Sequence, residues 1–275
     1  MATLEPGMTF STFLLTSVFF ATIATGLLAP SNKAAAQDSR SLCDTLASSR
    51  YDTTRPPGLA GVEQEKIDTA KALPACRDAQ AKAPADARLA FQLGRTLMQD
   101  GKEKEALVLF EQAATAGHPT AMVNLGVALH ETKPDEAFSW YSRAAALGDL
   151  LGQYNLGVAY QDGVGTPVDV TQALAWLQKS SNQGDDVAAY NIAIIHDEGT
   201  LVPENTDKAL TYYRLAVDRG NTDAMVNLGI MYEKGEGVAA DVATALGLYK
   251  HAAGLGDADA KAEVDRLEAD DDRQE

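Results

Sequence analysis

Residues 152–184 read GQYNLGVAYQDGVGTPVDVTQALAWLQKSSNQG, and this stretch decides the fold because its parts return along the chain. Apolar residues at helical spacing around Leu156 predict a first helix. A glycine-rich turn, DGVG at 162–165, ends that helix because glycine tolerates positive φ. Offsets of three, four and seven then predict one buried stripe on a second helix, made of Ala173, Trp176, Leu177 and Ser180.

Several columns of this stretch recur in phase beyond residue 84. The small-residue phrase appears as Gln92-Leu93-Gly94, Asn124-Leu125-Gly126, Asn155-Leu156-Gly157, Asn191-Ile192-Ala193 and Asn227-Leu228-Gly229. Alanine recurs at Ala106, Ala137, Ala173, Ala209 and Ala245, and a closing glycine recurs at Gly117, Gly148, Gly184, Gly220 and Gly256. Asp169, Asn205 and Asp241 each lie four residues before a column alanine and are predicted to cap the second helix. We therefore expect five repeats, at 84–117, 118–148, 149–184, 185–220 and 221–257.

The combined pattern, Ala-x-x-Asn-Leu-Gly-x-x-Tyr-x-x-Gly followed by Asp-x-x-x-Ala-x-x-(Trp/Tyr)-Tyr-x-x-Ala-Ala-x-x-Gly, resembles the Sel1-like repeat, the longer-looped relative of the tetratricopeptide repeat. The resemblance implies an all-α fold, a right-handed α/α superhelical solenoid whose inner surface is lined mainly by the first helices. The first two copies have short inter-helix turns, closer to the tetratricopeptide form. The fourth copy has Ala193 in the glycine column and His196 in the tyrosine column.

The segment before the repeats, 37–83, is predicted to cap the stack. Pro84 lies where the tetratricopeptide pattern places a proline between repeats, so 75–83 is interpreted as the second helix of an incomplete leading unit. The two cysteines, Cys43 and Cys76, lie in this segment, and an even count in an exported chain favours a disulfide. That bridge would tether the cap over the first face of the solenoid; two separate buried thiols are the alternative. At the other end, 258–275 is predicted to form a capping helix, over 258–267, and an acidic tail.

The first 36 residues have the features of a targeting segment. No charge occurs from Met8 to Ala29, and Ala34-Ala35-Ala36 supplies the small residues that a signal peptidase requires. We expect cleavage before Gln37, although Glu5 stands where basic residues are usual, and an uncleaved membrane anchor remains the alternative. Either way the remainder is predicted to be periplasmic or secreted, with the anchor as its one contact with a membrane.

The charge of the chain bears on its partners. The net charge is −16 and the pI is near 4.6, which argues against a nucleic-acid ligand because phosphate would be repelled. Basic peptides or proteins fit better on this ground, and an aid to solubility is the alternative reason for the acidity.

The sequence contains no recognised catalytic or metal-binding constellation. The four histidines have no ligand spacing with a cysteine or with one another, and a Gly-x-Ser-x-Gly motif is missing. Gly163-Val164-Gly165 lacks the lysine of a phosphate-binding loop, and His196-Asp197-Glu198 falls at the end of a first helix. Helical phase favours core packing for Trp140, Tyr141, Trp176, Tyr212, Tyr213 and Tyr249. We expect no catalytic residue, no cofactor and no metal.

One column is a candidate for binding. In the related tetratricopeptide modules the position just before the small pair projects toward the inner groove, and here it holds Asn124, Asn155, Asn191 and Asn227. A side-chain amide both donates and accepts, so a ladder of four could hold the backbone of a peptide segment. Alternatively, each amide satisfies local backbone groups between helices.

The family analogy sets the functional expectation. We expect an exported protein-protein interaction scaffold or adaptor that binds a protein or peptide in its concave groove. A periplasmic regulator of an envelope sensor kinase is the first alternative. A β-lactam-binding or hydrolysing enzyme is a remote second one, because the cysteine-rich relatives associated with it carry a cysteine pair in each repeat, whereas no cysteine follows Cys76 here.

Overall fold

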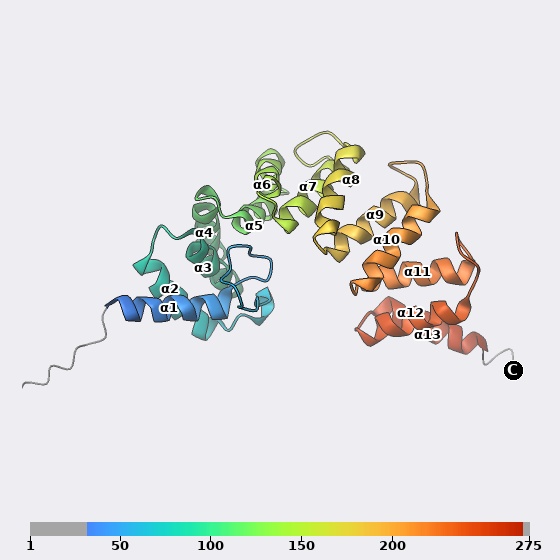
Figure 1. Cartoon of the computed structure of the whole chain (residues 1–275), viewed down its shortest axis with the longest axis horizontal. Coiled ribbons are helices and arrows are strands. Elements are labelled where there is room, and N and C mark those ends of the chain that lie inside the picture. The colour runs from blue at the N-terminus through green and yellow to red at the C-terminus, as the bar shows by residue number, and fades with distance from the viewer. Residues whose placement is uncertain (1–31, 272–275) are drawn as a thin grey trace, which may run out of the picture.

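The computed structural model describes residues 32–271, and the predicted targeting segment lies almost wholly outside them. Within this range the chain is helical and follows an arc from α1 to α13 (Figure 1). The helices are α1 (Asn32–Ala47), α2 (Thr69–Lys82), α3 (Ala87–Gln99), α4 (Glu103–Thr115), α5 (Pro119–Leu129), α6 (Pro134–Ala146), α7 (Leu150–Asp162), α8 (Val170–Asn182), α9 (Asp186–Glu198), α10 (Thr206–Asp218), α11 (Thr222–Lys234), α12 (Val242–Gly254) and α13 (Ala258–Asp271), with a 3₁₀ turn at Gln64–Lys66. Each helix packs against the next, which is the arrangement of a repeat solenoid.

The repeats are helix pairs whose ends are set by local chemistry. As predicted, Asp169, Asn205 and Asp241 cap the second helices, each side chain accepting the backbone N–H three residues on. Gly163 and Gly235 end first helices at φ 77°, in the left-handed region. The turns inside the first two pairs cover 100–102 and 130–133, whereas those of the last three cover 163–169, 199–205 and 235–241.

The glycine column lets the two helices of a pair approach closely. A Cβ added at Gly126 would lie 2.5 Å from Tyr141 Cε1, and one at Gly229 would lie 2.4 Å from Tyr249 Cε1. Tyr141, Tyr213 and Tyr249 are fully buried, as helical phase predicted. Trp140, Trp176 and Tyr212 are only partly buried, and the two tryptophans stack under Arg143 and Lys179 at 4.2 and 3.5 Å. The aliphatic stems of Arg143 and Lys179 cover the helix surface, while their charged groups reach water.

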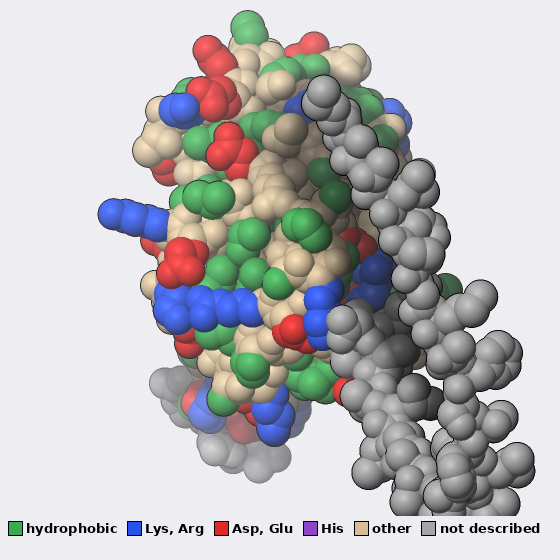
Figure 2. Space-filling view, turned by 90° about the vertical axis from the view of Figure 1, so that its left-hand side faces the viewer, with side chains coloured by type: hydrophobic (Ala, Val, Ile, Leu, Met, Phe, Trp, Pro, Cys, Tyr) green, Lys and Arg blue, Asp and Glu red, His purple; other side chains and the backbone are tan. Residues whose placement is uncertain are grey.

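The predicted N-terminal cap is a further helix pair. Helices α1 and α2 pack on one another and on α3, and the Cys43–Cys76 disulfide joins them. Side-chain capping by Asp68 starts α2 at Thr69, six residues before the expected helix at 75. Seen from this end, hydrophobic side chains lie interspersed with Lys, Arg, Asp and Glu, which is the polar outer face that a capping unit needs (Figure 2).

The C-terminal end is a half repeat. Asp257 caps α13 by accepting from Ala260 N at 2.8 Å, in the column position that starts each first helix. The helix continues to Asp271, past the predicted end at 267, and in this extension Glu268 pairs with Lys250 of α12 at 2.8 Å. No helix within 32–271 is long and apolar enough to cross a membrane. The predicted cleavage site before Gln37 falls within α1 of the uncut chain.

Candidate functional site

The segment between α1 and α2 forms a closed loop on the inner side of the arc, below α5 (Figure 1). We call residues 48–62 the Ω-loop, because Val62 N donates to Ser48 O at 2.7 Å and brings its two ends together. Arg95 of α3 holds both ends, donating to Ala47 O and to Val62 O at 2.7 Å each. Burial lowers the pKa of Arg95 to about 10, a value at which the guanidinium is still charged at neutral pH.

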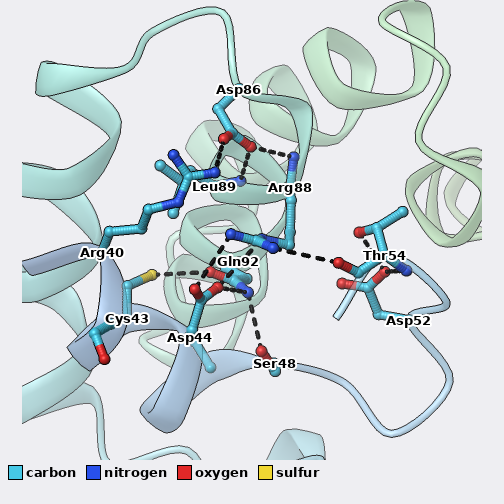
Figure 3. Close-up of polar contacts among 12 residues, drawn as sticks. Arg40, Cys43, Asp44, Ser48, Asp52, Thr54, Asp86, Arg88, Leu89 and Gln92 are labelled. Atoms are coloured by element: carbon cyan, nitrogen blue, oxygen red, sulfur yellow. Dashed lines mark hydrogen bonds and ion pairs between the residues drawn. The ribbon is translucent and has the colours of Figure 1, made fainter. Parts of the chain in front are cut away.

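The α1 helix is held on α3 by a buried polar cluster (Figure 3). The side-chain amide of Gln92, which is fully buried, donates to Asp44 Oδ1 at 2.9 Å and to Ser48 Oγ at 3.0 Å. Arg88 donates to Asp44 Oδ2 at 3.2 Å and to Thr54 O at 3.3 Å. The Cys43 sulfur lies 3.2 Å from Gln92 Oε1, a contact without a proton because that sulfur is bridged.

A second anchor joins the Ω-loop to α5. His118 Nε2 lies 3.3 Å from Asp52 Oδ1 and 3.1 Å from Thr54 Oγ1, and Nδ1 accepts from Ala121 N at 3.3 Å. The His118 ring also stacks on Phe91, with centroids 4.5 Å apart. Burial alone would raise the pKa of the Asp52 carboxyl, but the hydrogen bonds from His118 and Thr54 outweigh it and lower that pKa.

Two hollows lie beside the Ω-loop along the first helices. The first hollow, of about 440 Å³, lies between the loop, α3, α4, α5 and α7, with apolar walls from Phe91, Met98, Phe110, Val127 and Leu151. Asn124 and Glu103 add polar groups to its lining. The second hollow, of about 320 Å³, lies between the loop, α7 and the start of α9, lined by Arg50, Tyr154, Asp185, Asp186 and Val187. We call the inner side of the arc, between the Ω-loop and α11, the trough.

The four column asparagines are half-buried and lie on successive first helices. Asn155 Nδ2 donates to Leu151 O at 2.8 Å, Asn191 Nδ2 to Tyr154 Oη at 3.4 Å, and Asn227 Nδ2 to Tyr213 Oη at 3.1 Å. The Asn124 amide lines the first hollow and bonds no other residue within the described range. In the first repeat the same column holds Gln92, and in the closing half repeat it holds Glu263, which pairs with Arg266 at 2.8 Å.

Sequence reasoning missed the Ω-loop and the cluster that holds it. Its contacts join residues far apart in the chain, such as Asp52 and His118, and the loop itself has no periodicity. One signal was present: the cap column reads Asp86, His118, Asp149, Asp185 and Asn221, and His118 stands out in it. A second signal was glutamine at position 92, where the later repeats have asparagine.

The remaining polar residues singled out in the sequence have structural surroundings. His196 is buried at the end of α9, and burial followed by the charge of Lys208 lowers its pKa. Asp197 accepts from Tyr213 Oη at 2.9 Å. Among residues 32–271, no three His, Cys, Asp or Glu side chains gather in a way that could hold a metal ion.

The repeat geometry can be compared with known families. The model of the Sel1 repeat matches five times, at 83–118, 119–149, 150–185, 186–221 and 222–257. The chain belongs to the Sel1 repeat family. Proteins of this family are typically protein-protein interaction scaffolds. Membership of the Sel1 repeat family supports this general role and names no partner.

Solved structures support the same placement. A Sel1 repeat protein from Oxalobacter formigenes is 32% identical, with a TM-score of 0.58, over 62% of this chain and 72% of that one. The protective antigen c5321 of uropathogenic Escherichia coli, with an SLR fold, is 26% identical with a TM-score of 0.61, over 84% of this chain and 49% of that one. The Pseudomonas aeruginosa immunity protein Pa5087 is 19% identical with a TM-score of 0.51, over 80% and 82%, and shares the fold alone. No curated protein sequence matches this Sel1 repeat chain.

Proposed function

We propose that this protein is an exported interaction scaffold that holds a segment of a protein partner in the trough. The observation that carries the proposal is at Gln92, where the column side chain of the first repeat holds α1 through Asp44 and Ser48. Helix α1 belongs to the helix pair that precedes α3, so this contact shows that a polar side chain in this column can hydrogen bond groups outside its own repeat. The four asparagines repeat that position where no segment of the described chain covers them.

The asparagine ladder retains free capacity for such a partner. Asn155 and Asn191 each use one N–H in an internal hydrogen bond, whereas Asn227 bonds both Tyr213 and Tyr190. A primary amide has two N–H groups and a carbonyl oxygen with two lone pairs, so at Asn155 and Asn191 one donor and the acceptor remain. Their half-buried position lets these groups meet a peptide backbone while the side chain stays oriented by its internal partner.

Export is supported by the disulfide in the cap. The Cys43–Cys76 bridge joins α1 to α2, and such bridges persist in oxidising compartments. Mass spectrometry of the protein purified from its source would check this part. We expect a chain that begins at Gln37 with both thiols oxidised, and a reduced chain that retains residue 1 would contradict it.

The trough can be tested with a photo-crosslinking residue placed at Asn191, with Glu111 on the exposed side of α4 as the matched control position. We expect adducts of discrete mass from position 191 and none from position 111. In parallel, Asn155→Ala and Asn191→Ala should weaken capture of the crosslinked partner without changing the melting temperature. A lower melting temperature with unchanged capture would show instead that these amides serve packing alone.

A further inference from the structure

The two hollows beside the Ω-loop form one continuous surface. Tyr51 and Leu151 line both of them, so the hollows share a wall and follow one another along α5, α7 and α9. The Ω-loop is fixed in place by Arg95 and by the Asp52–His118 contact. The combined surface is therefore built into the fold.

The first hollow suits a bulky apolar side chain. Its walls are mainly apolar, and Val127 stands 56% exposed on them, so this apolar surface is open to a partner. Its volume of about 440 Å³ lies within the range of sites that bury a ligand group. The Asn124 amide, which bonds no other described residue, is placed to bond the backbone that carries such a side chain.

The second hollow suits a cation. Asp185 and Asp186 line it, and neither carboxylate has a Lys or Arg within 4.0 Å among the described residues. Asp185 is engaged as the cap of α9, and Asp186 accepts from the neutral amide of Asn221 at 3.0 Å. Arg50 of the chain's own Ω-loop also lines this hollow; it pairs with Glu63 at 3.1 Å, and its charge also acts on Asp186 from beyond 4.0 Å. One guanidinium faces two carboxylates, so the second hollow retains net negative charge for a partner to match.

We propose that the joined hollows bind a partner segment in which a bulky apolar residue lies close in sequence to Lys or Arg. This rests on the proposed function and names the chemistry of the segment that the trough holds. The apolar side chain fills the first hollow and the cation meets Asp186. Since the hollows open to the trough and to each other, a peptide can lie across both, whereas a small molecule would engage one.

The test is selection of randomised peptides of about 12 residues, displayed on phage, against the purified oxidised protein. We expect enrichment of an aromatic residue or leucine with Lys or Arg a few positions away, in one consistent order. A representative peptide is then synthesised, and its affinity measured for the protein and its variants. Val127→Lys places a charge in the apolar hollow and should weaken binding by about tenfold or more.

The matched controls separate site effects from general ones. Val108→Lys makes the same change at a 64% exposed valine on α4 and should leave affinity within about twofold. Asp186→Asn should weaken binding at low salt and less at high salt, because exposed charge pairs are screened. Asp207→Asn, on the exposed start of α10, should have little effect at either salt concentration.

Each other outcome overturns the proposal. Enriched peptides that do not pair an apolar residue with a nearby Lys or Arg, or affinity unchanged by Val127→Lys, would remove the two-hollow site. If Asn191→Ala weakens the same peptides, the trough still binds segments and the proposed function stands without this inference. A library that yields no binder, while an apolar dye such as anilinonaphthalene sulfonate binds in a Val127-dependent way, would assign the first hollow to a small apolar ligand instead.

Discussion

Gln92 and Asn191 occupy the same column of the repeat and meet different surroundings. Gln92 is fully buried and its amide hydrogen bonds Asp44 and Ser48 of the N-terminal cap. Asn191 is half-buried and makes one long hydrogen bond to Tyr154. The difference teaches that one repeat position is sealed in a buried polar cluster at the N-terminal cap and is only half-buried, with fewer partners, further along the solenoid.

The largest effect is expected from removing the disulfide that joins α1 to α2 in the N-terminal cap. Cys43→Ala with Cys76→Ala should lower the free energy of unfolding by about 3–4 kcal/mol, because the bridge constrains an unfolded loop of the 33-residue separation. Denaturant unfolding of the two proteins measures the change. Hydrogen exchange should speed up in α1 and α2 and not in α9 or α11. Equal loss of protection across the solenoid would show that the cap is not a separate region.

Comparing Gln92→Ala with Asn191→Ala measures directly how much each column position contributes to stability. Removal of the Gln92 amide leaves Asp44 and Ser48 without that buried partner, so we expect a loss of about 1–3 kcal/mol in unfolding free energy. The same change at half-exposed Asn191 should cost less than about 0.5–1 kcal/mol. Equal losses at both positions would contradict the distinction between the bound and the open parts of the column.

Acidification should loosen the Ω-loop. The folded pKa of Asp52 is lowered, so its stabilising contribution is present above the unfolded value of about 3.9 and is lost as pH falls through the lower folded value. Between pH 7 and pH 3 the wild type should lose more unfolding free energy than Asp52→Asn. Chemical denaturation at a series of pH values gives the comparison. Parallel pH curves for the two proteins would mean that Asp52 titrates alike in both states.

The smallest effect is expected at the opposite end of the solenoid. Arg266 joins α13 to Glu233 of α11 and to Glu263, at 2.7 and 2.8 Å, but these pairs are exposed to solvent. Arg266→Ala should therefore change the free energy of unfolding by less than about 1 kcal/mol. A loss as large as that at Gln92 would show that the two ends are closed by interactions of similar strength.

The sequence was sufficient for the repeat and its ends, because helix period, asparagine and aspartate caps, and glycine at positive φ are all local properties. Residues such as Asp169 and Gly163 act within a few positions of the chain, so their spacing predicts the helix pair. The sequence was also sufficient to predict the disulfide, because two cysteines permit only one intramolecular pairing. Half of the predicted aromatic stripe is only partly buried: Trp140, Trp176 and Tyr212 pack on core clusters with part of each ring still exposed.

The tertiary structure alone decided that the Ω-loop lies at the N-terminal end of the trough. The Ω-loop has no repeat and no period, and it is held by Arg95 and His118, which lie 33 and 66 residues from Val62 and Asp52. Pairings over such distances depend on how the helix pairs stack, which brings α3 and the start of α5 against the loop. The sequence determined a stack of helix pairs; the packing of that stack determined that Gln92 is enclosed by the cap while the column asparagines are only half-buried.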